Sequence, residues 1–200
     1  MKLFRKKRLY ALLLVIVIGV LFVRSGWIGQ LLYPVKYEKE IVSIAGEHQV
    51  DPFLIAAIIR VESNFQSGLV SSKNAQGLMQ IMPETAAWII EQTGLPEVTQ
   101  QFMMDEEVNI YLGAWYVKSL QNQFRHLLEN KPVKDRLAVI SAAYNAGPGT
   151  VRRWVEEGIW DGTYGQTSSI PYGETRHYIH RVVYYYHKYE EVYAKKWREG

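Results

Sequence analysis

A glutamate at the end of an apolar helix face is well placed for acid–base chemistry in this sequence. Segment 51–62 carries its apolar side chains at helical spacing, and Glu62 continues their stripe at the C-terminal end. Desolvation against isoleucines and the negative end of the helix dipole both favour a neutral carboxyl there. A general acid needs that neutral form near pH 7 to protonate a leaving oxygen. From this segment alone, a solvated Glu62, or one paired with Arg60 or Lys73, remains an open alternative.

Two later segments add hydrogen-bonding side chains. Residues 77–83 read Gly-Leu-Met-Gln-Ile-Met-Pro, where Gly77 permits close backbone approach and Gln80 both donates and accepts hydrogen bonds. Further on, Tyr144 and Asn145 stand at the end of a predicted helix, before a Gly-Pro-Gly turn. Each segment taken alone also fits a tight turn or a core side chain.

Taken in order, these segments resemble the lytic transglycosylase family related to the C-terminal domain of soluble lytic murein transglycosylase. The resemblance extends over about residues 37–189, and its specificity comes from several motifs in the right order rather than from any one of them. The matching stretches are Glu62-Ser63, Gly77–Pro83, Met104–Tyr116, Ala143–Gly147 and Ile170–Tyr178.

The resemblance implies an all-α, lysozyme-like domain of the goose-lysozyme/SLT type that cleaves the β-1,4 bond between N-acetylmuramic acid and N-acetylglucosamine in peptidoglycan. Glu62 matches the single catalytic acid/base. It would protonate the glycosidic oxygen and then take the proton of the muramyl 6-hydroxyl, which leaves a 1,6-anhydromuramyl end. Residues 63–83 contain no Asp or Glu. The sequence therefore offers no nearby second carboxylate of the kind that two-acid glycosidases use.

The resemblance also assigns roles to other positions. Tyr144 matches a tyrosine that orients the catalytic carboxyl and assists at the oxocarbenium-like transition state. Ser71 matches a serine that contacts the substrate's N-acetyl group, and Asn145 also fits a structural role at its helix end. The expected substrate-binding residues are Ser71, Gln80, Met82, Asn145, Glu174, Arg176 and Tyr178.

The elements that must position these residues are all predicted to be helices. Strand-like alternation is missing, and caps such as Asp51 before Pro52 mark helix starts. Helices are expected at 37–48, 51–62, 83–94, from 105 past 120, from 135 to about 146, at 150–157 and from 174 almost to the end. The aromatic stripe of the last helix is expected to pack in the core. The sequence predicts one compact all-α domain.

The N-terminus predicts a membrane anchor. Five cations in the first eight residues precede fifteen uncharged residues, 9–23. As a helix this run spans about 22 Å, less than the ~30 Å hydrocarbon core. No small-residue cleavage site follows directly, and Trp27 and Tyr33 suit an outer interfacial belt. We expect a cytoplasmic tail at 1–8, an uncleaved single-pass signal anchor at 9–24, a linker at 25–36 and an extracytoplasmic catalytic domain at 37–200. A cleaved signal peptide and a buried N-terminal helix are the alternatives.

Composition excludes several other classes of function. Six of the 23 basic residues lie in the first 24 positions, before any acid, so the rest of the chain carries 17 basic against 20 acidic side chains. The basic character therefore belongs to the N-terminus and does not indicate nucleic-acid binding. The absence of cysteine excludes disulfides, thiolate metal sites and a cysteine nucleophile. His177 and His180 lack a third ligand at metal spacing, so neither a metal nor a cofactor is expected.

The sequence thus predicts a lytic transglycosylase held at the cell membrane, with peptidoglycan strands as its partner. Two alternatives stay open. One is a muramidase that hydrolyses the same bond on the same fold, and the other is a non-catalytic glycan-binding module.

Overall fold

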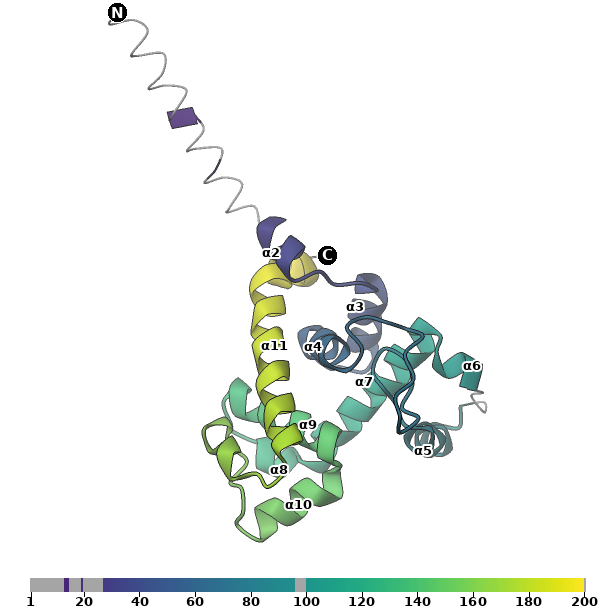
Figure 1. The fold of residues 1–200 in the computed structure, drawn as a ribbon, viewed down its shortest axis with the longest axis vertical. Helices are drawn as coiled ribbons and strands as arrows, with labels where there is room; N and C mark the ends of the chain where they lie inside the picture. The colour runs from purple at the N-terminus through teal and green to yellow at the C-terminus, as the bar shows by residue number, and fades with distance from the viewer. Residues whose placement is uncertain (1–12, 15–18, 20–26, 96–99, 200) are drawn as a thin grey trace, which may run out of the picture.

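The structure, a computed structural model, describes residues 13–14, 19, 27–95 and 100–199 (Figure 1). Throughout these residues the regular elements are helices. Within the loop 70–81 the backbone also forms two isolated β-bridges. The expected all-α class is confirmed. The elements are α2 (Trp27–Leu32), α3 (Glu38–Glu47), α4 (Pro52–Glu62), α5 (Pro83–Thr93), α6 (Gln100–Met103), α7 (Glu106–Gln123), α8 (Arg125–Leu128), α9 (Val133–Ala146), α10 (Pro148–Glu156), the 3-10 helix η1 (Tyr164–Ser169) and α11 (Gly173–Glu199).

Two helix starts follow from side-chain capping. Asp51 accepts a 2.9 Å hydrogen bond from the Phe53 N–H at the start of α4, and Asp105 accepts one of 3.0 Å from Val108 in α7. Asp135 does not begin its helix as predicted. Helix α9 starts two residues earlier, and the Asp135 carboxylate accepts from the backbone N–H of Tyr164 instead.

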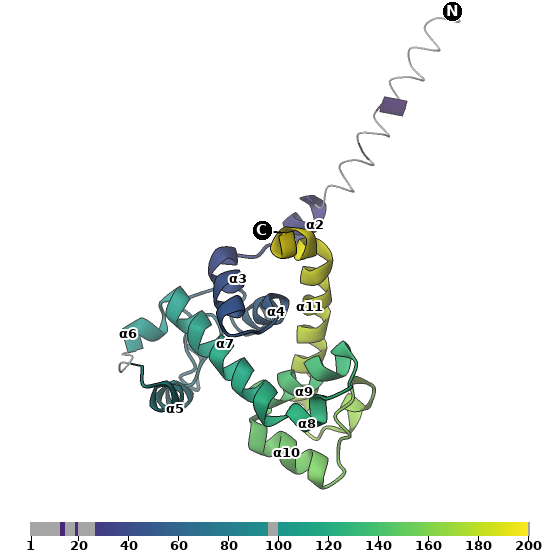
Figure 2. The ribbon, with the colours of Figure 1, turned by 180° about the vertical axis from the view of Figure 1, so that it is seen from behind.

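The core is built around α4 and α11. Residues 53–59 of α4 are all buried, and Figures 1 and 2 show α4 between α3 and α11. The expected aromatic stripe of α11 packs inward. Tyr185 is half-buried, and the other members are at most 9 % exposed, namely Tyr178, Val182, Tyr186, Tyr189, Tyr193 and Trp197. Because α11 packs on both α4 and α9, it fixes the ends of these two helices relative to each other.

The segment expected as a linker is partly helical and packs on the domain. The α2 backbone at Gly29 lies so close to Val192 of α11 that a Cβ there would collide with it. The Tyr193 hydroxyl donates to the Tyr33 carbonyl at 3.0 Å, and the hydroxyls of Tyr33 and Tyr184 are 2.7 Å apart.

The expected signal anchor at 9–24 falls almost entirely outside the described residues. Among the helices that the structure does describe, none combines the length and apolar character needed to cross a bilayer.

Candidate active site

Glu62 ends α4 in an apolar setting, beside a tyrosine from the other end of the chain. The Tyr178 hydroxyl of α11 donates a 2.7 Å hydrogen bond to Glu62 Oε1. Burial raises the pKa of Glu62 to about 7, although the Tyr178 hydrogen bond and the nearby Arg181 guanidinium act to lower it. The negative charge of Glu174 adds to the upward shift. Near neutral pH, therefore, Glu62 exists in both its protonated and its ionised form.

A tight turn at 77–82 is held by the buried Asn109 of α7. Its Oδ1 accepts from the Met79 N–H at 2.8 Å, and its Nδ2 donates to the carbonyls of Gln76 at 2.9 Å and Met103 at 2.8 Å. Gly77 has a φ of +76°, and a Cβ at that position would overlap the Asn109 amide. One side chain thus satisfies three backbone groups, and glycine is required for it to approach.

Gln80 lies in the same turn, with its own side chain folded back. Its Nε2 donates to the carbonyl of Gly77 at 2.9 Å and to that of Leu69 at 3.1 Å. Both bonds tie the turn to the loop before it. The side-chain oxygen of Gln80 has no bond among these contacts and is the atom that the amide can still offer to a ligand.

Tyr144 of α9 donates its hydrogen bond to this turn rather than to Glu62. Its hydroxyl donates to the Met79 carbonyl at 2.8 Å. Burial raises its pKa well above the usual value, and the charge of nearby Glu62 adds to this effect. Tyr144 was expected to orient the carboxyl of Glu62, but in this structure the hydrogen bond to that carboxyl comes from Tyr178, whereas the Tyr144 hydroxyl holds the turn.

An aromatic row extends from Tyr144 along α7 and α5. The ring centroids of Tyr144 and Tyr116 are 5.4 Å apart, those of Tyr116 and Trp88 6.3 Å, and those of Trp88 and Trp115 5.2 Å. Trp88 and Tyr116 line a cavity of about 320 Å³ together with Glu84, Thr85, Gln123 and Pro148. The Trp88 side chain is 36 % exposed, so part of its ring is open to solvent.

Comparison with known proteins identifies the family. Residues 41–164 match the model of the transglycosylase SLT domain. The chain belongs to the transglycosylase SLT family. The resemblance drawn from the motifs is confirmed.

Individual relatives agree with this assignment. The chain is 33 % identical to soluble lytic murein transglycosylase of Escherichia coli strain K12 over 162 residues, which are 78 % of this chain and 24 % of the relative. It is 33 % identical to membrane-bound lytic murein transglycosylase C of Serratia proteamaculans strain 568, over 74 % of this chain and 44 % of the relative. The chain thus spans about a quarter of the length of the soluble relative.

A solved structure shares the fold. It is an inactive glutamate-to-glutamine mutant of the lytic transglycosylase Slt from Pseudomonas aeruginosa. The match has a TM-score of 0.69 and 33 % identity, and it covers 81 % of this chain and 25 % of that one.

Several of the substrate-binding positions expected in the SLT domain make internal hydrogen bonds. Ser71 Oγ accepts from the N–H groups of Lys73 at 3.3 Å and Ala75 at 3.0 Å, which orders the loop. Asn145 Oδ1 accepts from the Thr175 hydroxyl at 2.7 Å and so joins the end of α9 to the start of α11. These bonds give Ser71 and Asn145 a structural role, and their contact with substrate stays a prediction.

Three further positions lie at element boundaries. Met82 is the residue before α5, half-buried and without a side-chain cap bond. Arg176 donates to the carbonyls of Ile170 and Pro171, which fixes the approach to α11. Glu174 is exposed in the first turn of α11.

Sequence reasoning missed three contributors to this site. Asn109 holds the turn, and Arg181 lowers the pKa of Glu62. The third is the direct hydrogen bond that Tyr178 donates to Glu62. Asn109 lies inside a motif that matches the family, but a buried amide is recognised as a clamp only when its three backbone partners are in view. Arg181 follows Tyr178 by three residues, the spacing of one helix face, and this signal was available.

Of the two histidines considered as metal ligands, His180 contacts two hydroxyl groups instead. His180 Nδ1 is 2.7 Å from the Tyr164 hydroxyl, and its Nε2 is 3.3 Å from the Thr167 hydroxyl. Among the described residues, no three His, Cys, Asp or Glu side chains are grouped so as to hold a metal ion.

Proposed function

We propose that this chain is a lytic transglycosylase that cleaves the β-1,4 bond between N-acetylmuramic acid and N-acetylglucosamine, with Glu62 as its acid/base. The observation that carries the proposal is the half-buried Glu62 carboxyl, whose pKa is raised to about 7 by desolvation and whose Oε1 accepts a hydrogen bond from Tyr178. The relatives named lytic murein transglycosylases support the substrate, and the inactive glutamate-to-glutamine mutant of one relative supports an essential carboxyl.

The proposed reaction uses Glu62 twice. In its neutral form Glu62 donates its proton to the glycosidic oxygen as the bond from that oxygen to the muramyl anomeric carbon breaks. As a carboxylate it then takes the proton of the muramyl 6-hydroxyl, whose oxygen bonds to the same carbon and closes the anhydro ring. Glu62 ends protonated, and no water is consumed. A pKa near 7 suits both steps, because neither form is strongly disfavoured at neutral pH.

Tyr178 and Tyr144 would support different parts of this cycle. A hydrogen bond from Tyr178 stabilises the ionised form of Glu62 that exists after the first step. Tyr144 fixes the turn at Met79 and keeps its own proton, and we propose that its oxygen assists at the positive transition state. Gln80, Met82, Glu174 and Arg176 are proposed to contact the glycan.

One observation favours a second candidate. Glu174 is distant in sequence but close enough for its charge to raise the pKa of Glu62. In an inverting glycosidase a second carboxylate activates water. Glu174 is the acid that would serve a muramidase on this fold.

Product analysis decides between the two reactions. The full chain, in detergent, is incubated with purified sacculi and the released muropeptides are weighed by mass spectrometry. A transglycosylase gives anhydromuramyl ends that are lighter by one water than the reducing ends of hydrolysis, and a Glu174→Gln variant still gives them. Reducing ends from the wild-type chain would overturn the transglycosylase proposal, and intact sacculi would overturn both.

We also propose that residues 9–24 anchor the domain at the membrane, facing the peptidoglycan. The fifteen uncharged residues behind a basic tail support this, as does a relative named as membrane-bound. Fractionation of cells that express the full chain or a version without residues 1–24 tests the idea. Release of the full chain by salt or carbonate wash would contradict it.

A further inference from the structure

A second cavity lies at the opposite end of α4 from Glu62. It has a volume of about 500 Å³, within the range of small-ligand sites. It is bounded by α4, the α7–α8 corner, the start of α9 and α11, and Asp51 lies at its α4 edge. Asp51 and Glu62 are eleven residues apart, which is ~16 Å along a helix. The cavity is therefore separate from the candidate active site.

The lining of this cavity combines buried apolar side chains with two arginines that form no ion pair among the described residues. Leu54, Leu137 and Ile140 are buried side chains that line it. The Arg136 guanidinium is exposed and has no hydrogen bond or ion pair within the described chain, and Arg125 bonds only the amide oxygen of Asn122. Two guanidiniums at the rim are thus available to a carboxylate.

The start of α9 adds to this preference for an anion. Val133, its first residue, lines the cavity, and no side chain caps the helix. The uncapped first N–H groups and the positive end of the dipole favour a negative group nearby. His126 also lines the cavity, and its imidazole can donate an N–H hydrogen bond to an anion there.

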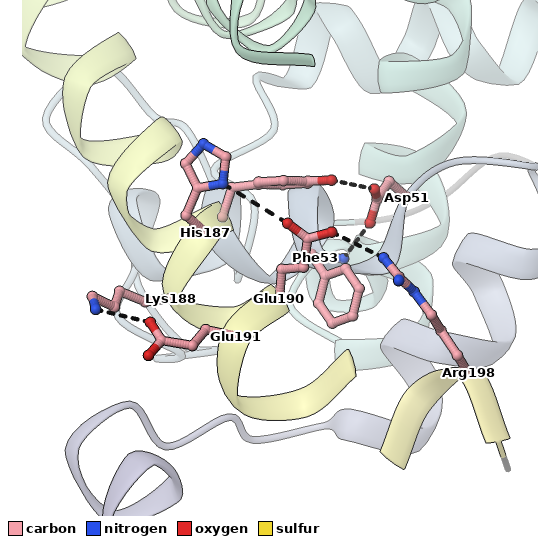
Figure 3. Close-up of polar contacts among 8 residues, drawn as sticks. Asp51, Phe53, His187, Lys188, Glu190, Glu191 and Arg198 are labelled. Carbon is pink, nitrogen blue, oxygen red and sulfur yellow. Dashed lines mark hydrogen bonds and ion pairs between the residues drawn. The ribbon is translucent and has the colours of Figure 1, made fainter. Parts of the chain in front are cut away.

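Two acids face the same space, and they differ in availability. Both oxygens of Asp51 accept hydrogen bonds, Oδ1 from Phe53 N–H at 2.9 Å and Oδ2 from the Tyr186 hydroxyl at 2.8 Å (Figure 3). Asp51 is therefore occupied within the fold. Glu129 is exposed and forms no ion pair within the described part of the chain, so it can receive an ammonium group.

We propose that this cavity binds a short zwitterionic peptide, of the kind carried as stems on peptidoglycan strands, with its carboxylates at Arg125 and Arg136. Such stems carry carboxylates for the guanidiniums, an amino group for Glu129 and alanine methyls for the buried apolar side chains. The identity of the peptide rests on the proposed function, since stems accompany the strands that the active site would cleave. The site would hold the domain on stem-bearing strands without taking part in the chemistry.

The test is a calorimetric titration of the full chain, in detergent, with the tripeptide L-alanyl-γ-D-glutamyl-meso-diaminopimelate. We expect Arg136→Ala and Arg125→Ala each to weaken binding about tenfold, as for loss of a hydrogen bond to a charged group. Arg152→Ala is the matched control, because Arg152 is exposed on α10 and does not line the cavity. Binding by wild type should also weaken as salt is raised.

Cleavage assays separate this proposal from the proposed function. On glycan strands stripped of their peptides, Arg136→Ala should cleave like wild type, and on intact sacculi it should be slower. Glu62→Gln should bind the tripeptide normally. If Glu62→Gln cleaves glycan while the arginine variants lose the tripeptide, the acid/base assignment fails and the peptide site stands. No binding by wild type at millimolar tripeptide, equal binding by wild type and both arginine variants, or loss of binding in Glu62→Gln would overturn the peptide site.

Discussion

The hydroxyl of Tyr178 lies 2.7 Å from Oε1 of Glu62, although 116 residues separate the two in the chain. The bond joins the start of α11 to the end of α4, and Tyr178 is itself buried. Two opposing effects thus meet on one carboxyl. Burial favours the neutral acid, and the hydrogen bond favours the carboxylate. Their balance leaves the pKa of Glu62 at about 7, which suits a group that must donate a proton and then accept one.

The first prediction concerns the pH dependence of cleavage. Because the first step needs protonated Glu62, kcat/KM should fall about tenfold per pH unit above pH 7. Tyr178→Phe removes a bond that lowers this pKa, so the descending limb should move to higher pH while the rate at its plateau decreases. Release of soluble muropeptides, followed from pH 5 to 9, measures both. Tyr184→Phe, on the exposed face of α11, is the control, and an unshifted limb in Tyr178→Phe would contradict the assignment.

Two charged residues of α11 should shift the descending limb of the pH profile of kcat/KM in opposite directions. Arg181 lowers the pKa of Glu62 and Glu174 raises it. Arg181→Gln should therefore shift the descending limb to higher pH, and Glu174→Gln should shift it to lower pH. Both residues are exposed, so neither change should affect folding by more than about 0.5 kcal/mol. Shifts of the same sign in the two variants, in an otherwise identical assay, would exclude Glu62 as the titrating group.

The raised pKa of Glu62 should also make the stability of the fold depend on pH. The folded state keeps the Glu62 proton up to about pH 7, whereas the unfolded chain loses it near pH 4.5. Between these values the unfolded state binds fewer protons, so this group's contribution to stability is lost as pH rises. Glu62→Gln removes the effect and should gain up to about 3 kcal/mol over wild type at pH 8, with little gain at pH 4. Urea unfolding at the two pH values tests it, and a gain independent of pH would mean that the carboxyl is not desolvated.

The sequence predicted the local parts of this fold better than the contacts between them. Asp51, Asp105 and Gly94 mark helix ends because capping depends on a few neighbouring residues. Asp135 looked like another cap, but its carboxylate is used by the distant Tyr164. Such a pairing is decided by tertiary packing and leaves no local signal.

In the candidate site, too, the local features were predicted from the sequence and the contacts between helices were not. The apolar stripe that ends at Glu62 predicted a desolvated carboxyl, and the raised pKa agrees with it. Which tyrosine reaches that carboxyl depends on how α9 and α11 pack on α4, and spacing along one helix does not contain this information. Tyr178 is buried and Tyr144 is half-buried, and both lie near Glu62, but their hydroxyls donate to different acceptors.

Asn109 provides a test of the clamp beneath the site. Asn109→Ala leaves the N–H of Met79 and the carbonyls of Gln76 and Met103 without partners, and it opens space in a fully buried position. Each orphaned buried group costs about 1–3 kcal/mol, so we expect a loss of at least 2 kcal/mol in urea unfolding. Asn122→Ala, which removes only an exposed bond to Arg125, should cost less than about 0.5 kcal/mol. Near-equal stability of the two variants would show that the turn holds itself.

The aromatic row makes a last prediction about glycan binding. Trp88 is partly exposed over a cavity that it shares with Tyr116, and Tyr116 contacts Tyr144. A sugar ring packed on Trp88 would bury apolar C–H groups against the indole face. Trp88→Ala should therefore raise KM for sacculi between about threefold and tenfold, the equivalent of roughly 0.5–1.5 kcal/mol for an aromatic contact, and leave kcat nearly unchanged. Phe102→Ala, equally apolar and 58 % exposed on α6, should change neither constant. A fall in kcat at constant KM would instead mean that Trp88 acts by supporting Tyr116 and Tyr144, because loss of that support would disturb the turn at Met79 rather than the grip on the strand.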